Sequence, residues 1–234
     1  MNAMTTTLIT GANKGLGRET ARRLLADGHE VWLAARNPQR GEATAGELGG
    51  RFVQLDVTDE ASVTAAAEVV AAESGALDVL INNAGIGGGF RPLAETTPED
   101  VRRVFETNVF GIVRVTRAFL PLLERSSNPV IVNVSSGMGS VAVTTDPGRF
   151  ESTLIGLAYP ASKTALNMIT SQYAKAYPRM RINAVDPGYT ATELNGHRGT
   201  KTVQEGAEVI VRMARLDASG PTGAFLDSEG SVPW

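Results

Sequence analysis

Two side chains that can exchange protons, Tyr159 and Lys163, stand four residues apart in the chain. In a helix this spacing places them on one face, one turn apart. A neighbouring ammonium favours a phenolate and so lowers the pKa of the phenol. A phenol tuned in this way can act as a general acid and base near neutral pH. The alternative is a surface tyrosine and a surface lysine without a joint role.

A glycine-rich turn lies near the N-terminus, in the segment TGANKGLG at 10–17. An apolar, β-branched run precedes the turn and a helical pattern follows it, which is the setting of a dinucleotide-binding turn. Gly11, Gly15 and Gly17 would let the backbone turn sharply and let a pyrophosphate approach the N-terminus of the following helix. The alternative is a structural turn that binds no ligand.

The end of the next β-like run, at 30–35, indicates which dinucleotide would bind. NAD sites carry an acidic residue at this place, where it contacts the ribose hydroxyls. Here Arg36 follows the run instead, and a guanidinium suits a 2′-phosphate. Lys14, inside the glycine turn, could supply a second positive charge. The two cations therefore favour NADP over NAD; the alternative is that both are solvated surface residues.

The composition excludes several other kinds of chemistry. There is no Cys and there are only two His, His29 and His197, so thiolate zinc sites, iron–sulfur clusters and Cys nucleophiles are excluded and no metal is expected. The net charge of −3 does not indicate binding to nucleic acid or to an anionic membrane, both of which attract positively charged proteins. We find neither a signal-peptide pattern nor an apolar run of membrane-spanning length, and we expect a cytoplasmic protein without nucleic-acid or membrane partners.

The elements that must position these residues alternate between strand and helix along the whole chain. The expected strands are 5–10, 30–35, 51–55, 77–82, 130–134, 181–185 and 223–226, and the expected helices are 18–27, 39–48, 58–74, 97–123 with a possible break at Gly111, 159–177 and 202–215. This alternation predicts an α/β fold with a parallel sheet covered by helices on both faces, in a single domain over 1–234. Two irregular segments, 85–94 and 137–158, follow strands, where binding crevices of such sheets lie.

Four further motifs stand in order with the glycine turn and the Tyr–Lys pair. They are NNAG at 82–85, Asn108 in FETNVFG, VNVSS at 132–136 and PGYTAT at 187–192. Over essentially its whole length the chain resembles the short-chain dehydrogenase/reductase family, and more narrowly its carbonyl-reductase-like branch. The resemblance implies a Rossmann-type, doubly wound parallel sheet and a nicotinamide cofactor.

The resemblance also implies a role for each catalytic residue. Tyr159 would protonate the carbonyl oxygen of the substrate as hydride arrives from the nicotinamide. Ser136, rather than its neighbour Ser135, would orient that oxygen. Lys163 would lower the pKa of Tyr159 and bind the nicotinamide ribose, and Asn108 would help to hold a water that relays protons to Lys163.

The implied cofactor site extends along the motifs. Asp56 would contact the adenine with Val57 beside it, and Thr192 with the Thr190 backbone would contact the carboxamide. The cofactor-binding residues expected from the resemblance and from the two cations are Gly11, Asn13, Lys14, Gly15, Leu16, Gly17, Arg36, Asp56, Val57, Asn83, Ala84, Gly85, Pro187, Gly188, Thr190 and Thr192.

One departure from the family pattern concerns the spacing between Ser136 and Tyr159, which are 23 residues apart. The commonest family spacing is shorter. The extra stretch, within the 137–158 segment, carries a turn signal at 146–148 and Phe150. We expect this insertion to pack over the pocket mouth and to shape substrate choice; the alternative is a surface insertion without contact to the site. The insertion also argues against the tetramer that is common in the family, so we expect a monomer or a homodimer.

The sequence therefore predicts an NADPH-dependent, reversible reduction of a ketone or aldehyde to an alcohol, with Tyr159 as the general acid and base. The expected pocket-lining residues Met138, Phe150, Tyr189 and Leu194 favour a small apolar substrate. The alternatives are an NAD-linked alcohol dehydrogenase and a non-catalytic NADP-binding regulator.

Overall fold

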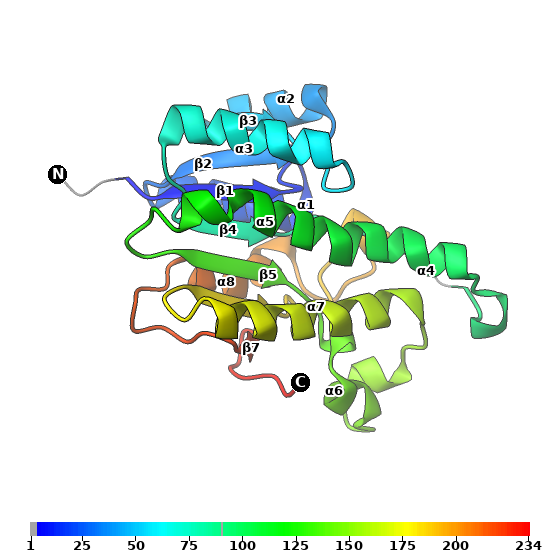
Figure 1. Ribbon diagram of the computed structural model, residues 1–234. Helices are drawn as coiled ribbons and strands as arrows, with labels where there is room; N and C mark the ends of the chain where they lie inside the picture. Colours follow the sequence, from blue (N-terminus) through cyan, green and yellow to red (C-terminus); the bar gives the residue numbers. More distant parts are fainter. Residues whose placement is uncertain (1–3, 90) are drawn as a thin grey trace.

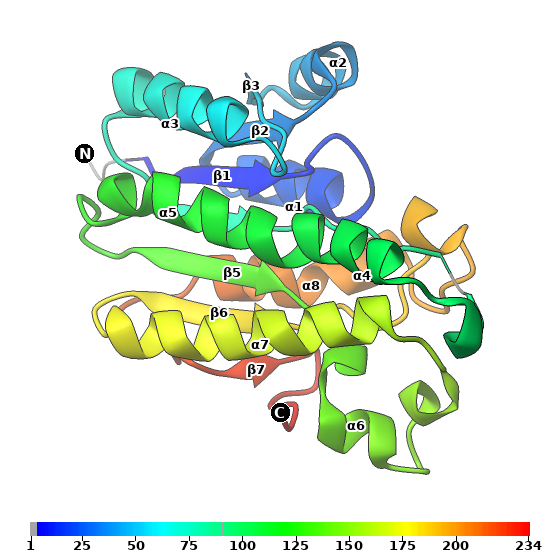
Figure 2. The ribbon, with the colours of Figure 1, turned by 45° about the vertical axis from the view of Figure 1, so that its right-hand side comes forward.

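A computed structural model describes residues 4–89 and 91–234. Its centre is one seven-stranded sheet with helices on both sides (Figures 1 and 2). The strands are β1 (Thr6–Thr10), β2 (Glu30–Ala35), β3 (Arg51–Gln54), β4 (Val79–Asn82), β5 (Val130–Val134), β6 (Arg181–Val185) and β7 (Phe225–Leu226). Their order is β3-β2-β1-β4-β5-β6-β7, and every pairing is parallel. The predicted α/β fold with a doubly wound parallel sheet is confirmed.

Helices cover both faces of the sheet. They are α1 (Gly15–Ala26), α2 (Pro38–Leu48), α3 (Glu60–Ser74), α4 (Pro98–Phe105), α5 (Gly111–Leu123), α6 (Val141–Thr145), α7 (Ala158–Ala176) and α8 (Val203–Ala214). Figure 2 shows α3, α5 and α7 in front of the sheet and α1 with α8 behind it. Since the chain winds from β1 outward to β3 and then returns to β4, the sheet has its switch point between β1 and β4, where α/β folds bind ligands.

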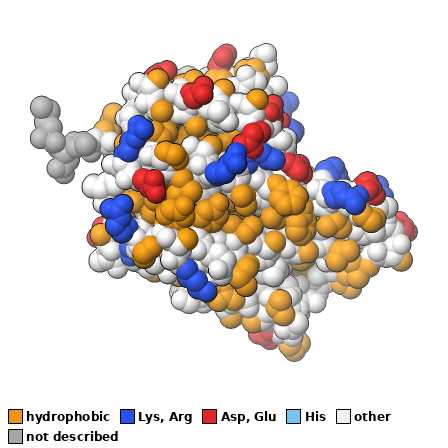
Figure 3. Space-filling view, in the orientation of Figure 1, with side chains coloured by type: hydrophobic (Ala, Val, Ile, Leu, Met, Phe, Trp, Pro, Cys, Tyr) orange, Lys and Arg blue, Asp and Glu red, His pale blue; other side chains and the backbone are white. Residues whose placement is uncertain are grey.

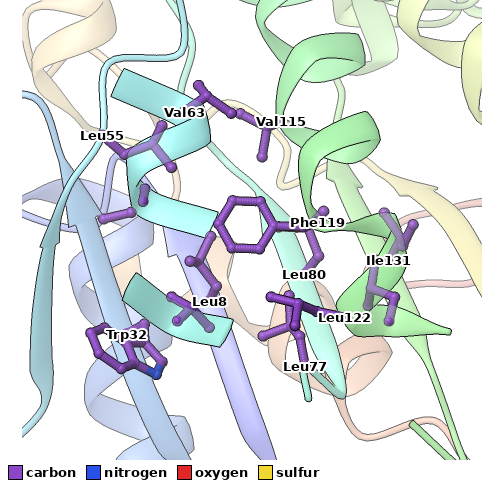
Figure 4. Close-up of a cluster of buried hydrophobic side chains, with 14 of the residues drawn as sticks. Leu8, Trp32, Leu55, Val63, Leu77, Leu80, Val115, Phe119, Leu122 and Ile131 are labelled. Atoms are coloured by element: carbon purple, nitrogen blue, oxygen red, sulfur yellow. The ribbon is translucent and has the colours of Figure 1, made fainter. Parts of the chain in front are cut away.

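The core lies in two layers, one on each face of the sheet. The front layer packs β1, β4 and β5 against α3 and α5, with Phe119 of α5 near its centre (Figure 4). The rear layer packs the sheet against α1, α2 and α8. Every residue of β1, β4 and β5 is buried. This explains why β4 and β5 read as nearly continuous apolar runs rather than as an alternation of apolar and polar residues.

Local sequence signals place several helix starts. The Thr97 hydroxyl accepts a hydrogen bond from the Asp100 amide at 3.2 Å, and the Asp100 carboxylate accepts one from the Thr97 amide at 3.1 Å. This capping box, with Pro98 in the first turn, begins α4 where the sequence predicts it. The Asp59 carboxylate caps α3 by accepting from the Ala61 amide at 2.9 Å.

The structure differs from the expected elements in three places. Helix α1 begins at Gly15, three residues before the apolar pattern starts, because the glycine turn itself forms its first turn. The break expected at Gly111 is a π-helical turn, Glu106–Phe110, that joins α4 to α5. The final strand, β7, has two residues instead of four.

The 137–158 segment is not irregular throughout. It contains a 3-10 turn at Gly137–Gly139, helix α6 and a second 3-10 turn at Phe150–Thr153. The C-terminal tail holds this segment to the sheet, since the Ser140 hydroxyl donates to the Pro233 carbonyl at 2.6 Å. In the other irregular segment, 85–94, residue 90 lies outside the described residues.

The surface of the front layer carries apolar side chains. Figure 3 shows them gathered in a band across the face that α5 and α7 cover. Phe110, Val113 and Met168 are the exposed large apolar residues of these helices and the π-helical turn. In the part of the chain that the structure describes, each helix is too short or too polar to cross a membrane.

Candidate active site

The predicted site motifs meet at one edge of the sheet. Because the strands are parallel, their carboxyl ends lie together. The glycine turn follows β1, Asn83 follows β4, Ser136 follows β5, and Pro187 follows β6. Helix α7 then begins beside this edge and contributes Tyr159 in its first turn.

The structure brings the three expected catalytic side chains together. The Lys163 ammonium donates to the Val134 carbonyl at 2.8 Å and lies 5.5 Å from the centroid of the Tyr159 ring. Ser136 begins the turn after β5, where its hydroxyl accepts from the Met138 amide at 3.2 Å. Ser136 is also near enough to the Tyr159 phenol to lower the pKa of that phenol. Phenol, hydroxyl and ammonium therefore form one cluster.

The two adjacent serines have different partners, and the choice of Ser136 as the catalytic residue stays a prediction. The Ser135 hydroxyl is buried and donates to the Asn167 Oδ1 atom at 2.6 Å, and Asn167 in turn donates to the Gly139 carbonyl at 3.2 Å. Ser135 thus ties the end of β5 to α7, whereas the hydroxyl of Ser136 faces the phenol.

The pKa of Tyr159 differs in direction from the sequence-based expectation. Burial raises this pKa to about 12; hydrogen bonding by Ser136 opposes the rise and the charge of Asp186 adds to it. Burial also lowers the pKa of Lys163 to about 8, against the opposing effect of Asp186. In the chain by itself, loss of hydration is the largest influence on the pKa of Tyr159, and Lys163 is not among the groups that shift it. At neutral pH the phenol is protonated and the lysine charged, a state that suits donation of a proton to a carbonyl oxygen.

The lowered pKa of Lys163 predicts the pH dependence of carbonyl reduction. The ammonium is intact below pH 8 and lost as the pH rises through about 8. If the charged lysine supports proton donation by Tyr159, reduction is constant below this pH and falls above it. A profile of kcat/KM against pH checks this midpoint, with Lys175→Met as the control, because Lys175 lies exposed on the same helix. A profile that stays flat to pH 10 would contradict the prediction.

Asn108 lies in the π-helical turn between α4 and α5, a type of irregularity common at functional sites. Its side chain is fully buried. The Asn108 amide accepts from the Ile86 N–H at 2.9 Å, and it donates to the Ile86 carbonyl at 2.9 Å and to the Ser162 hydroxyl at 3.1 Å. Asn108 therefore joins the loop after β4 to the start of α7, next to Lys163. Its water-holding role stays a prediction.

The glycine turn packs tightly against the end of β4 and leads into an uncapped helix N-terminus. Gly11 and Gly15 have positive φ angles of 65° and 52°, and a Cβ atom on Gly17 would lie 2.5 Å from the Asn83 amide nitrogen. The same Asn83 amide donates to the Thr10 carbonyl at 2.8 Å and so couples the ends of β1 and β4. Helix α1 has no side-chain cap and no acidic residue in its first turn. Its free N–H groups therefore remain available to an anion.

Three other residues expected to bind the cofactor contact neighbouring residues of the protein. The Asn13 carbonyl accepts from the Thr44 hydroxyl at 3.3 Å. The Asp56 carboxylate accepts from the Thr58 amide and hydroxyl at 2.9 and 2.8 Å, so it is held within its own turn. Leu16 packs towards α8, where a Cβ on Gly206 would lie 2.9 Å from it.

The two cations expected at a 2′-phosphate are both exposed. Arg36 follows β2, and Lys14 precedes α1. Within residues 4–89 and 91–234 neither forms an ion pair with a carboxylate. Two cations without neutralising partners beside the glycine turn leave positive charge free for a phosphate.

The loop after β6 closes the crevice from the other side. Gly188 has a φ angle of 73°, and the Thr190 hydroxyl donates to the Pro187 carbonyl at 3.2 Å. Thr192 reaches the glycine turn, since a Cβ on Gly15 would lie 3.5 Å from its methyl group. The structure therefore places both sides of the expected cofactor crevice within reach of each other.

A cavity opens beside the Tyr159 phenol. Met138 lines it, together with Gly87, Gly88 and the 156–160 segment. Of the other residues expected to line a pocket, Leu194 packs near Gly87, and Phe150 and Tyr189 pair with ring centroids 5.6 Å apart. These three are not among the residues that line this cavity.

The fold and the site together define a class of protein. It has a parallel α/β sheet, and the glycine turn and the cluster of Ser136, Tyr159 and Lys163 lie at the same edge of that sheet. Residues 5–204 match the sequence model of the short chain dehydrogenases, and the chain belongs to that family of oxidoreductases. Among the described residues, no three His, Asp or Glu side chains are grouped so that they could hold a metal ion.

Individual relatives resemble the chain over nearly its whole length. It is 40% identical to "Short-chain dehydrogenase anuI" of Penicillium roqueforti, covering 96% of this chain and 94% of that protein. It is 34% identical to (+)-neomenthol dehydrogenase of Arabidopsis thaliana, covering 94% of each. Among solved structures, NADPH-bound carbonyl reductase from chicken fatty liver superposes with a TM-score of 0.88 at 30% identity over 99% of each chain.

The sequence analysis did not predict two residues that lie near the cluster of Ser136, Tyr159 and Lys163. Asp186 directly follows β6 and is buried, and Glu151 comes from the 137–158 segment. A carboxylate at the carboxyl end of a parallel strand is a signal that could have indicated Asp186. No comparable signal indicated Glu151, since its approach to the site depends on how the insertion folds.

Proposed function

We propose that this chain reduces a small carbonyl compound to an alcohol, with Tyr159 as the proton donor and NADPH as the source of hydride. The observation that carries the proposal is the cluster of Tyr159, Ser136 and Lys163 beside the glycine turn. Ser136 holds and orients the carbonyl oxygen, Tyr159 donates its proton to that oxygen, and Lys163 keeps its charge next to the phenol. When bound, NADPH supplies the hydride that reaches the carbonyl carbon.

The residues at the glycine turn fit such a cofactor. The uncapped N-terminus of α1 offers N–H groups to a pyrophosphate. Gly17 allows the start of α1 to pack against Asn83 and Gly11, where a Cβ would clash. Arg36 and Lys14 offer charge to a 2′-phosphate. A carbonyl reductase solved with NADPH is among the structures that this chain resembles, which supports the same cofactor. For the remaining residues expected to bind the cofactor, we keep the roles that the sequence analysis predicts.

The relatives support a carbonyl substrate. They include (-)-isopiperitenone reductase of Mentha piperita, which is 34% identical, and salutaridine reductase of Papaver somniferum, whose structure superposes with a TM-score of 0.83 at 29% identity. We propose an apolar ketone or aldehyde for this chain as well. The insertion supplies one wall of the cavity beside Tyr159, because Met138 and residues 156–158 line it. A cytoplasmic location and a monomeric or homodimeric state stay predictions.

A substrate panel tests the proposed function directly. Oxidation of NADPH and of NADH is followed with aldehydes, ketones and quinones. Carbonyl-dependent oxidation of NADPH is the expected result. If no carbonyl is turned over and NADPH nevertheless raises the melting temperature, the chain is a cofactor-binding regulator; if NADH is preferred, the assigned cofactor is wrong.

Replacing Arg36 by leucine tests the cofactor preference. A guanidinium–phosphate hydrogen bond contributes about 1.5–3 kcal/mol, so Arg36→Leu should raise the KM for NADPH about 10- to 100-fold. The KM for NADH should hardly change, because NADH lacks the phosphate. Initial rates with both cofactors check this. Arg179→Leu, at an exposed position before β6, is the matched control. Equal losses with NADPH and NADH would assign Arg36 a structural role instead.

A further inference from the structure

One amide side chain holds both ends of the turn that carries Ser136. Asn167 lies in α7, about one helical turn after Lys163. Its Oδ1 atom accepts from the Ser135 hydroxyl at 2.6 Å, and its amide nitrogen donates to the Gly139 carbonyl at 3.2 Å. Ser135 directly precedes Ser136, and Gly139 ends the 3-10 turn that follows it. Asn167 therefore brackets Ser136 and the two residues after it.

These two hydrogen bonds are shielded from water. Asn167 and Ser135 are each only 3% exposed. A hydrogen bond in such a place is costly to leave unmade, because a buried donor or acceptor without a partner has lost its hydration and gained no bond in exchange. The amide and its two partners are therefore held in one fixed arrangement.

The bracketed turn also packs directly on the backbone of α7. A Cβ atom on Gly139 would lie 2.7 Å from the carbonyl carbon of Lys163 and from its Cβ atom. On its other side the turn meets two carboxyl groups, since a Cβ atom on Gly137 would lie 2.9 Å from Asp186 Oδ2 and 3.0 Å from Glu151 Oε1. With neighbours on both sides, a displacement of α7 must move the turn and the serine hydroxyl at its start.

A second buried pair joins β5 to α7 about one helical turn deeper. The Asn133 amide nitrogen donates to the Thr170 hydroxyl at 2.9 Å. Asn133 and Ser135 are two residues apart and so face α7 from the same side of the sheet. Beyond Thr170, Ala174 of α7 belongs to the apolar front layer. The interface is therefore polar at the end that carries the reactive cluster, and directional hydrogen bonds fix the helix along the strand there.

We propose that Asn167 is a positioning residue, which fixes Ser136 relative to Tyr159 and Lys163 by bracketing the serine turn from α7. Tyr159, Lys163 and Asn167 follow one another at intervals of four residues and so share one face of the helix. The amide thus places the serine in the same frame as the phenol and the ammonium.

The inference rests on the proposed function, in which Ser136 orients the carbonyl oxygen of the substrate. In that reaction the Tyr159 O–H bond breaks and its proton goes to the carbonyl oxygen, while NADPH is oxidised and its hydride forms the new C–H bond. Asn167 takes no part in the proton transfer and acts through the place of Ser136.

Replacing Asn167 by leucine tests the proposal, because leucine has a similar size and makes neither hydrogen bond. A misplacement of about 1 Å at a reacting centre can cost about 10²-fold in rate, so kcat for carbonyl reduction should fall about 10- to 100-fold. The dissociation constant for NADPH should stay within about twofold of wild type, since the glycine turn and Arg36 belong to other elements. Steady-state rates at saturating NADPH and a titration with NADPH measure the two effects.

Thr170→Val is the matched control. It keeps the shape of the side chain and removes the hydroxyl that accepts from Asn133, just as Asn167→Leu removes the partner of Ser135. Both variants should lower the melting temperature by a similar amount, about 3–10 °C. Only Asn167→Leu should lower kcat, measured well below both melting temperatures, because only its partners flank Ser136. Equal losses of kcat would attribute the effect to a general loosening of α7 and overturn the proposal.

A double variant tests whether the effect passes through the turn. Ser135→Ala removes one of the two hydrogen bonds, and we expect kcat to fall about 3- to 10-fold. If Ser135 acts only through Asn167, the variant that combines Ser135→Ala with Asn167→Leu should be no slower than Asn167→Leu alone. Losses that multiply would show that Ser135 acts on the reaction independently, and the bracketing role would be wrong.

The activity of Tyr159→Phe separates this inference from the proposed function. If Tyr159→Phe is inactive and Asn167→Leu keeps the wild-type kcat, the inference is wrong and the proposed function stands. If Tyr159→Phe keeps full activity, or wild type reduces no carbonyl, the proposed function fails and the inference falls with it. A loss of NADPH affinity in Asn167→Leu as large as its loss of kcat would move the effect to the cofactor and contradict the proposal. Should Asn167→Leu not fold, Ser135→Ala is compared with Thr170→Val instead, and a wild-type kcat in Ser135→Ala would refute the inference.

Discussion

Replacing Tyr159 by phenylalanine is expected to lower kcat/KM for carbonyl reduction about 10²- to 10⁴-fold, the range typical for loss of a general acid. The substitution removes one hydroxyl and leaves the ring that packs near Lys163. Because burial raises the pKa of Tyr159 to about 12, the phenol holds its proton across the physiological range and is available as an acid. Steady-state rates with NADPH and a carbonyl that wild type reduces check the prediction.

The binding of NADPH provides the internal control for this variant. A phenylalanine at 159 should leave the dissociation constant for NADPH and the melting temperature close to wild type, because the glycine turn is untouched. Tyr173→Phe, on the same helix and stacked on Tyr177, is the matched tyrosine control and should keep full activity. Comparable activity losses in the two variants would show that tyrosine removal disturbs α7 rather than the chemistry.

Truncating Phe119 to alanine is expected to lower the free energy of unfolding by about 3–5 kcal/mol, as for other large buried aromatic residues. Phe119 is 0% exposed and lies at the centre of the front core layer between α5 and the sheet (Figure 4). The loss combines the transfer free energy of the ring with the cost of the cavity that remains. Denaturant unfolding followed by circular dichroism measures the change in midpoint.

Phe110 offers a matched comparison in the same part of the chain. It is 52% exposed, in the π-helical turn before α5. Phe110→Ala should change stability by about 0.5 kcal/mol or less, as surface substitutions usually do. If both variants lose the same stability, the destabilisation comes from the helix itself and not from the buried ring. Phe110→Ala also tests whether the exposed apolar band matters for association, since a dimer would weaken.

The 137–158 insertion contacts the proposed site and is not only an extension of the surface. Its Phe150 packs on Tyr189 at 5.6 Å between ring centroids, and its Glu151 reaches the turn behind Ser136. The same segment is held by the C-terminal tail through Ser140 and Pro233. A segment without a periodic pattern therefore contacts both the loop after β6 and the turn that carries Ser136.

Much of the fold could be predicted from local patterns. A nearly continuous apolar run identified β5, because strands buried on both faces are rich in apolar residues. Thr97 and Pro98 marked the start of α4, and the start of α3 was expected at Thr58 or Asp59, because caps act within one turn of the chain. The structure shows Asp59 as the cap. The predictions were weaker where packing decides the structure. Helix α1 extends back to Gly15, and the break near Gly111 is a π-helical turn that carries Asn108.

The sequence by itself determined the strand–helix alternation, the glycine turn and the spacing of Tyr159 and Lys163, since each depends on residues close together in the chain. Only the tertiary structure decided the protonation states and the partners of these residues. Burial depends on packing, so the rise in the pKa of Tyr159 does not follow from its distance to Lys163. The meeting of Glu151 with Asp186 joins residues 35 positions apart. Contacts of that kind arise when the sheet brings separate loops to one edge, and no local pattern encodes them.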